Sequence, residues 1–216
     1  MKLVKQSYKI TRWDPEKDLE EICRGARICY KSKELETRPE MEKFIESLVK
    51  RDPDNPHYSP LEHSILSVEF VTNRGITHEL VRHRLISPNQ ESTRYCNYSK
   101  GKFDSHVRFI LDTSISAKDM GDWIADCADC EERYFARLAK GMRPDQARGV
   151  LNNDVKSEIK ITANYREWRH IFNLRCDEVH AHYQMVELMA PLLREVSNEL
   201  PCIFGDIALK YNGADV

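Results

Sequence analysis

Long hydrophobic runs are missing from the sequence of 216 residues, which has no stretch of 18 consecutive apolar residues that could cross a bilayer. The amino terminus also lacks the apolar segment of a signal peptide. Glycine and proline, at 8 and 9 residues, are too few for a collagen-like or disordered chain. These absences argue against a membrane-spanning or fibrous protein and favour a globular one.

An excess of charge of either sign is absent as well. The 33 lysines and arginines nearly balance the 35 aspartates and glutamates, so the net charge is −2 and gives no overall sign of nucleic-acid binding. The seven cysteines are scattered and odd in number. In a chain without a signal peptide this pattern predicts reduced thiols and a cytoplasmic location.

The order of apolar residues predicts both helices and strands. Apolar side chains at helical spacing predict helices over 15–31, 36–51, 75–86, 118–140, 144–151 and 164–199, the last kinked near Pro191. Alternation predicts strands over 64–72, 106–111 and 155–162, and the breaker residues 52–56 predict a loop. Connections of varied length favour an α+β fold, a mixed sheet flanked by helices, over a regular βαβ array. No boundary divides the chain, so we predict a single domain over 1–216.

Polar and basic residues are densest between residues 82 and 102. This stretch holds five lysines or arginines and one glutamate, a local charge of +4. We expect Arg82, His83 and Arg84 at the end of a short helix, followed by a polar loop. Guanidinium groups next to hydroxyl and amide side chains suit phosphate binding, because the guanidinium fork matches phosphate oxygens. A small-molecule phosphate site is favoured over a merely solvated basic surface.

The order of these residues resembles a family signature. Residues 82–95 fit the pattern RHRxxSxNxxSxRY of the flavin-dependent thymidylate synthases. Further stretches resemble other segments of that family in the same order: 26–30, 57–63, 147–151 and 162–175. Together they cover roughly residues 25 to 190, and chance agreement of several ordered segments is implausible.

The resemblance implies a fold, an activity and an assembly. The fold expected is the α+β fold of this family, in a homotetramer whose sites are shared between subunits. The activity expected is reductive methylation of dUMP to dTMP, with methylenetetrahydrofolate as carbon donor and FAD reduced by NADPH as hydride donor. No metal, nucleic acid or membrane is implied as a partner.

The resemblance also implies site residues. Its dUMP contacts correspond to Glu79, Leu80, Val81, Arg82, Gln90, Glu91, Ser92, Thr93, Arg94, Arg148 and Arg175. Its FAD contacts correspond to Ser59, Arg82, His83, Arg84, Gln90, Asn164, Tyr165, Arg166 and His170. Arginines and imidazoles suit a cofactor with a pyrophosphate and a flavin ring.

Arg175 is the residue expected to carry the chemistry. It shares one helical stripe with Asn164, Trp168 and Ile171, so we expect a half-buried guanidinium that needs an anionic partner. The resemblance implies that it stabilises dUMP ionised at N3, which activates C5. Without the resemblance, an arginine that extends to solvent or pairs with Asp177 or Glu178 would be preferred.

Other polar residues receive supporting roles, and some depart from the family pattern. No Ser-His-Asp arrangement surrounds Ser92, so we expect it to position substrate. His83 lies between two arginines, which favours a neutral imidazole that forms hydrogen bonds. Glu79 stands where many members have glutamine, and His170 where some have asparagine. Whether His180 or His182 approaches the flavin stays open.

Three other functions have some support in the sequence, and each is less favoured. A folate-only thymidylate synthase would need a cysteine nucleophile, for which Cys202 is the candidate, but a buried apolar role near the end of the last helix is preferred. A metal site would use His180 and His182, or Cys127 and Cys130, yet neither pair has further ligands at recognisable spacing. A nucleic-acid module would rest on the 82–102 stretch alone.

Overall fold

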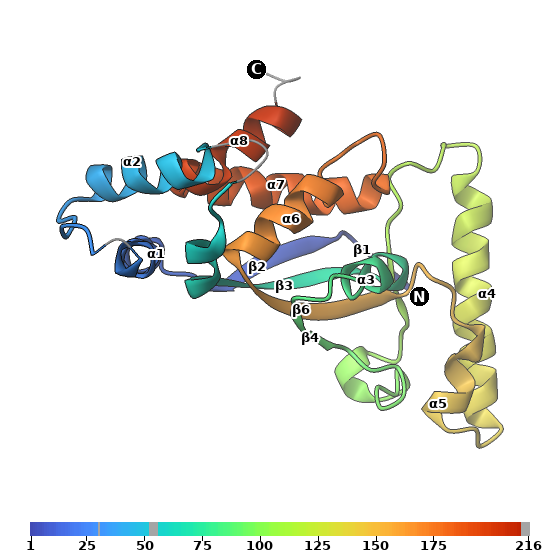
Figure 1. The fold of residues 1–216 in the computed structure, drawn as a ribbon. Helices are drawn as coiled ribbons and strands as arrows, with labels where there is room; N and C mark the ends of the chain where they lie inside the picture. Colours follow the sequence, from blue (N-terminus) through green and yellow to red (C-terminus); the bar gives the residue numbers. More distant parts are fainter. Residues whose placement is uncertain (30, 52–55, 213–216) are drawn as a thin grey trace. The chain divides into compact units, whose positions relative to one another are not determined.

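The structure is a computed structural model and describes residues 1–29, 31–51 and 56–212 (Figure 1). Most of the predicted loop at 52–56 therefore lies outside the described residues. The chain forms two compact units. Unit 1 contains Met1–Tyr8, Glu69–Arg82 and Pro88–Lys160, and unit 2 contains Lys9–Val68, His83–Ser87 and Ile161–Val216. The prediction of a single domain over 1–216 stays a prediction.

The strands form two sheets. β1 (Lys2–Val4) and β5 (Arg108–Ile110) pair in parallel, with Leu3 opposite Phe109. The other sheet has four strands in the order β2-β3-β6-β4. These are β2 (Ser7–Arg12), β3 (Ile65–Asn73), β6 (Lys156–Asn164) and β4 (Ser87–Gln90). The chain passes from one unit to the other within each of these four strands.

The helices complete an α+β fold, which confirms the predicted class. Unit 1 holds α3 (Arg74–Leu80), α4 (Met120–Ala139) and α5 (Pro144–Ala147), with short 3-10 turns at Gly101–Phe103 and Arg148–Val150. Unit 2 holds α1 (Pro15–Ile28), α2 (Arg38–Val49), a 3-10 turn at Ser59–His63, α6 (Tyr165–Arg175), α7 (Tyr183–Glu199) and α8 (Pro201–Asn212). None of the helices in the described ranges has the length and hydropathy required to span a bilayer.

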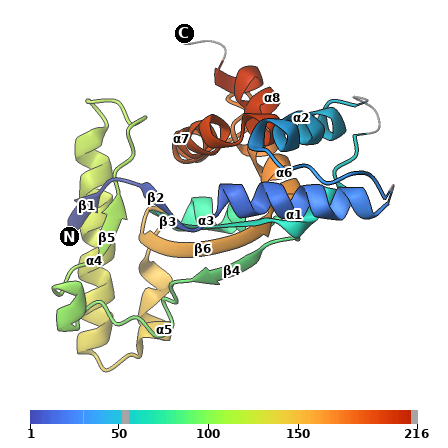
Figure 2. The ribbon, with the colours of Figure 1, turned by 90° about the vertical axis from the view of Figure 1, so that its left-hand side faces the viewer.

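The core of unit 2 is a helical layer. Figures 1 and 2 show α2, α6, α7 and α8 side by side, and α2, α6 and α7 each pack against a neighbour in this group. Phe172 of α6 lies 5.5 Å from the Trp168 ring and 5.8 Å from the Phe204 ring, measured between ring centroids. The Trp168 indole donates to the Leu66 carbonyl of β3 at 3.0 Å, which fixes α6 against β3.

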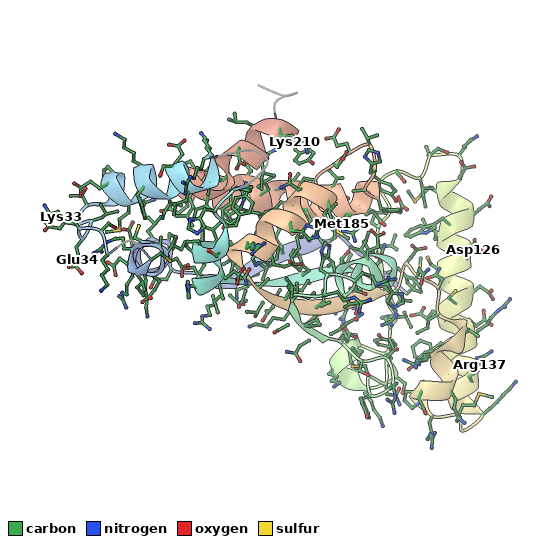
Figure 3. All side chains as sticks on the ribbon, viewed as in Figure 1. Lys33, Glu34, Asp126, Arg137, Met185 and Lys210 are labelled. Atoms are coloured by element: carbon green, nitrogen blue, oxygen red, sulfur yellow. The ribbon has the colours of Figure 1, made fainter. Side chains whose placement is uncertain are left out.

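The core of unit 1 lies between α4 and the β1–β5 sheet, which run beside each other in Figure 2. Cys127 and Tyr134 on the inner side of α4 are buried together with Phe109 of β5. Asp126 projects from the exposed side of the same helix (Figure 3). This alternation of buried and exposed positions is the amphipathic pattern by which the helix was predicted, and Gly141 ends that segment with a φ of 85°.

The helix predicted over 75–86 is shorter in the structure. α3 ends at Leu80, and the Arg82 amide donates to the Glu79 carbonyl in a tighter turn. Arg82, His83 and Arg84 therefore do not lie on a helix. The predicted polar loop also begins with β4, which contains Pro88. Proline is tolerated there because β4 is an edge strand, where only one side of the strand is paired.

The long helical segment predicted over 164–199 is interrupted in a different place. Pro191 lies inside α7, whereas the break falls at residues 176–182. Asp177 explains it, because its carboxylate accepts from the Val179 amide at 3.0 Å and its carbonyl accepts from the His180 and Ala181 amides. Such local bonds compete with the helix. Cys202 also lies in α8, a separate helix that was not predicted.

Candidate functional site

In unit 1, the side chain of Gln90 is fixed between two elements. Its amide nitrogen donates to the Thr77 hydroxyl of α3 at 2.8 Å and to the Ser157 hydroxyl of β6 at 3.2 Å. Thr77 and Ser157 are buried. The amide group of Gln90 is thus held in one orientation at the end of β4.

The next residue, Glu91, is held by a hydroxyl and an ammonium group. One carboxylate oxygen accepts from the Tyr98 hydroxyl at 3.1 Å, and the other accepts from the Lys156 ammonium at 2.9 Å. The side chains of Glu91 and Lys156 are each 12% exposed, and burial raises the pKa of Tyr98. We call Glu91, Tyr98 and Lys156 the Glu91 cluster. It keeps a positive and a negative charge together in a mostly buried place.

Two further predicted dUMP residues of unit 1 meet directly. The Arg148 guanidinium donates to the buried Thr93 hydroxyl at 2.9 Å. Around them, Ser92 accepts from the Arg94 amide at 3.3 Å, and Arg94 lies over the ring of Tyr95, 5.4 Å from its centroid. The segment 92–95 therefore combines a fixed hydroxyl with an exposed guanidinium.

The remaining predicted dUMP residues of unit 1 lie at the end of α3. Leu80 is completely buried, so its side chain belongs to the core. Val81 and Arg82 are exposed, and Glu79 is half-buried. Arg82 is thus the residue of this segment whose charged side chain is open to an anion.

In unit 2, His83 is at the centre of a second polar group. The Arg175 Nε donates to His83 Nε2 at 3.0 Å, and the other ring nitrogen, Nδ1, lies 3.7 Å from a carboxylate oxygen of Glu167. The His170 ring is edge-on to His83, with 5.8 Å between centroids. We call His83, Glu167, His170 and Arg175 the His83 cluster. Side chains that are far apart in sequence, from residue 83 and from α6, come together in it.

The charge state of His83 follows from its burial. The residue is 6% exposed, and burial first, then the charges of Arg175 and His170, lower its pKa to about 4. The imidazole is therefore neutral at physiological pH, as predicted. The predicted cause was wrong in part, because the charges that lower the pKa of His83 are those of Arg175 and His170 rather than those of its sequence neighbours. Burial also raises the pKa of Glu167.

α6 places the members of this cluster. The Asn164 side chain caps the helix by accepting from the Glu167 amide at 2.9 Å. Trp168 and Ile171 are completely buried, and Arg175 is half-buried at the last turn, as the predicted stripe requires. A cation at this end of a helix is favoured by the helix dipole.

The predicted FAD residues of unit 2 divide by exposure. Ser59, Arg84, Arg166 and His170 are exposed. Arg166 donates to Glu62 at 2.6 Å across two partly exposed side chains. The Tyr165 hydroxyl, by contrast, is buried, accepts from the Trp13 indole at 2.9 Å and donates to Asp18. Its side chain serves the fold of unit 2.

Comparison with protein families identifies the chain. Residues 10–202 match the model of the thymidylate synthase complementing protein family, Thy1. The chain belongs to this family. Curated relatives agree: the flavin-dependent thymidylate synthase of Geobacter sulfurreducens is 30% identical over 86% of this chain and 80% of its own length. That of Mycobacterium avium is 31% identical over 78% and 72%, respectively.

A solved structure has a similar fold. The crystal structure of a UMP/dUMP methylase, PolB from Streptomyces cacaoi, bound with 5-Br dUMP, superposes with a TM-score of 0.78. It covers 97% of both chains at 18% sequence identity. The fold is therefore shared although most residues differ.

The cysteines and histidines that the sequence suggests for other chemistries are not members of the Glu91 cluster or the His83 cluster. All seven cysteines are free. Cys202 is buried, and burial raises its pKa to about 12, so its thiol is protonated at neutral pH. Cys127 is buried on the inner side of α4. His180 is exposed beside Asp177, and His182 caps α7 by accepting from the Gln184 amide at 3.3 Å.

Sequence reasoning missed two charged residues of these clusters. Glu167 lies three residues after Asn164, which reads as an ordinary acidic residue in the first turn of a helix. Lys156 lies in an alternating strand, where a charged residue suggests the solvent face. In both cases the local pattern predicts the secondary structure. It does not reveal the partner, because His83, the partner of Glu167, and Glu91, the partner of Lys156, are distant in sequence.

Proposed function

We propose that this chain is a flavin-dependent thymidylate synthase that methylates dUMP to dTMP. Family membership, the names of the curated relatives and the dUMP methylase of similar fold support the proposal. In the proposed reaction, the methylene carbon of 5,10-methylenetetrahydrofolate separates from the folate nitrogens and bonds to C5 of dUMP, and C5 loses its hydrogen as a proton. A hydride that comes from NADPH completes the methyl group. The products are dTMP, tetrahydrofolate and oxidised NADP.

One observation supports the chemistry most directly: the Arg175 guanidinium lies beside a neutral imidazole, 3.0 Å away. Because His83 is neutral, it orients Arg175 without cancelling its positive charge. We propose that this charge stabilises the pyrimidine of dUMP ionised at N3. Electron density then rises at C5, which becomes the nucleophile, and no covalent bond to the enzyme is required.

The unit 1 residues are proposed to bind the nucleotide. Arg82, Arg94 and Arg148 suit the phosphate and the base oxygens, since each guanidinium can donate two parallel hydrogen bonds. The Ser92 hydroxyl adds a donor. The side chains of Leu80, Gln90 and Glu91 are occupied within the protein, so we expect these residues, and Val81 and Glu79 beside them, to contribute chiefly through backbone groups.

The exposed donors of unit 2 fit FAD. Two guanidinium groups, Arg84 and Arg166, match the charge of a pyrophosphate, and Ser59 and His170 offer further hydrogen-bonding groups. Asn164 and Tyr165 would contribute through their backbone, because the side chain of each is engaged in the fold. When bound, FAD would supply hydride transfer to the pyrimidine. The phosphate of the cofactor would compete with Glu62 for Arg166.

Assembly and the other substrates belong to the same proposal. We expect a homotetramer with sites shared between subunits, NADPH as reductant and methylenetetrahydrofolate as carbon donor, in the cytoplasm. A chain of 216 residues is small for a site that holds a flavin, a nucleotide and a folate, which favours shared sites. Analytical ultracentrifugation tests the assembly, and a monomer that is fully active would exclude shared sites.

The decisive experiment is one assay. Purified protein is incubated with dUMP, methylenetetrahydrofolate and NADPH, with and without added FAD, and dTMP is quantified. We expect dTMP that depends on each of the three substrates and on flavin. A protein that takes up no FAD, or that carries FAD and makes no dTMP, would contradict the proposal.

Cys202→Ala is the matched control. The thiol is buried and protonated, so we expect the variant to keep its activity within about twofold, as a change remote from the reacting atoms. Loss of dTMP formation with an intact fold would instead indicate a cysteine nucleophile, as in a folate-only thymidylate synthase.

A further inference from the structure

The His83 cluster fixes which nitrogen of His83 carries the proton. His83 is neutral, so its ring bears one N–H group. Nε2 accepts a hydrogen bond from Arg175, whose guanidinium can only donate. The proton must therefore be on Nδ1, the nitrogen that faces Glu167.

Glu167 is placed to maintain that tautomer. Its carboxylate oxygen lies 3.7 Å from Nδ1, a distance that is longer than a hydrogen bond but within reach of a strong electrostatic contact. Both side chains are less than 10% exposed, so water screens the contact little. The Asn164 cap holds the Glu167 backbone and sets where this carboxylate enters the cluster.

We propose that Glu167 is a positioning residue: it keeps the proton of His83 on Nδ1, so that Nε2 accepts from Arg175 and holds the guanidinium in its reactive orientation. The effect on catalysis rests on the proposed function, whereas the tautomer does not. The His83 ring thereby links two positions on α6 that are eight residues apart, about 12 Å along the helix axis. A carboxylate that orients a histidine through one nitrogen while the other nitrogen acts is a common arrangement in enzymes.

A metal site is the other function these groups suggest. One ligand atom from each of His83, Glu167 and His170 lies within 4.8 Å of the others. Arg175 argues against it, because a guanidinium hydrogen-bonded to the His83 ring would repel a divalent cation bound at that ring. The arrangement therefore favours positioning of Arg175 over metal binding.

The test reads the tautomer directly. The full-length protein loaded with FAD is labelled with ¹⁵N-histidine, and two-dimensional ¹H–¹⁵N multiple-bond spectra are recorded at pH 7.5 for the wild type, Glu167→Gln and Glu167→Leu. His83→Gln identifies the signal of His83 among the eight histidines. We expect protonated Nδ1 in the wild type. Glu167→Gln should retain it, because the negative end of the amide dipole still faces Nδ1, whereas Glu167→Leu should give a mixture that includes protonated Nε2.

Steady-state kinetics on the same variants test the consequence for Arg175. We expect kcat for dTMP formation to fall about tenfold in Glu167→Leu and to stay within about threefold of wild type in Glu167→Gln. The KM for dUMP should change less than threefold in both. If Glu167 had only a structural role, kcat would not fall in Glu167→Leu while KM stayed nearly constant, and Glu167→Gln would not restore kcat.

Several outcomes would overturn the inference. The wild type alone is sufficient: a His83 protonated on Nε2 contradicts it, even if the leucine variant does not fold. Unchanged kcat in Glu167→Leu contradicts it as well, and so does stoichiometric Zn²⁺ uptake that moves the His83 signals. If the wild type makes no dTMP, the proposed function fails, and the spectra still decide the role of Glu167 toward His83.

Discussion

The Glu91 cluster and the His83 cluster both bury titratable side chains. The Glu91 cluster buries an ion pair, whereas the His83 cluster buries a neutral imidazole. In unit 1, Glu91 and Lys156 form an ion pair at 2.9 Å, so each charge has a partner within the protein. In unit 2, burial keeps His83 neutral, and the charge of Arg175 lies next to a ring that does not cancel it.

We expect this difference to correspond to two tasks. A paired, hydrogen-bonded cluster is rigid, and it suits the fixed presentation of backbone and guanidinium groups to a nucleotide. A guanidinium that is hydrogen-bonded to a neutral base is oriented by that base without a second charge from it, which suits a group that faces developing negative charge. Nucleotide binding and chemistry are thus expected to respond differently to mutation.

The largest effect is expected for Arg175→Ala. Removal of the guanidinium should lower kcat for dTMP formation by about 10²–10³-fold, as for the loss of one stabilising donor at a developing negative charge. FAD should still bind, which its visible absorbance reports. Turnover near that of the wild type would show that Arg175 has no catalytic role. It would also contradict the expected functional difference between the two clusters.

The next effect is the pH dependence of stability caused by His83. Its pKa is lowered from 6.5 to about 4 in the folded protein, so the unfolded chain binds more protons between these values. Stability from the neutral imidazole is complete above pH 6.5 and is lost as the pH falls toward 4. This loss is expected to reach about 3 kcal/mol.

Urea unfolding of the wild type and His83→Gln at several pH values isolates this contribution. Glutamine does not titrate, so the wild type should lose stability relative to the variant across the window from pH 6.5 to 4. Parallel curves for the two proteins would show that His83 is not held neutral by the fold.

A smaller effect is expected for Arg148 in unit 1. Arg148→Ala should weaken dUMP binding about tenfold, which corresponds to about 1.4 kcal/mol, with little change in kcat at saturating dUMP. Thr93→Val removes the hydroxyl acceptor and leaves the charge, so a change of about threefold or less is expected. Calorimetry measures both affinities, and equal losses in the two variants would mean that the Arg148–Thr93 contact, rather than the charge, matters.

The smallest effect concerns Glu62 in unit 2. Glu62→Gln removes the carboxylate that competes for Arg166, so FAD affinity should rise about two- to fivefold, as expected when an exposed ion pair worth less than about 1 kcal/mol is released. Flavin fluorescence titration measures it. Weaker FAD binding in this variant would show that Glu62 assists the cofactor.

Local sequence patterns were sufficient for many of the regular elements, but they did not predict β1, β2, β4 or α8. The helical spacing of Leu19, Ile22 and Ala26 gave α1, and all three are buried. The alternation of residues 64–72 gave β3. Each of these patterns depends only on residues within one helix or strand, so it can be recognised from a single sequence without coordinates.

The sequence-based predictions are wrong or incomplete where a contact between residues distant in sequence determines the structure. β4 is a strand because it pairs at the edge of a sheet with β6, residues 156–164, which no local pattern around Pro88 reveals. The end of α3 and the break at Asp177 depend on competing turns. For the site, the motif supplied the candidate residues by resemblance, and that assignment stays a prediction. The pairing of Glu167 with His83, 84 positions away, needed coordinates.

Neither unit corresponds to a continuous piece of the gene, since each is assembled from three separate stretches of sequence. A recombination crossover between two related genes, wherever it falls between residues 9 and 160, leaves both units with segments from both parents. Chimeras of this kind are expected to lose complementary packing in each unit at once. We therefore expect this chain to tolerate single substitutions better than exchange of a continuous segment.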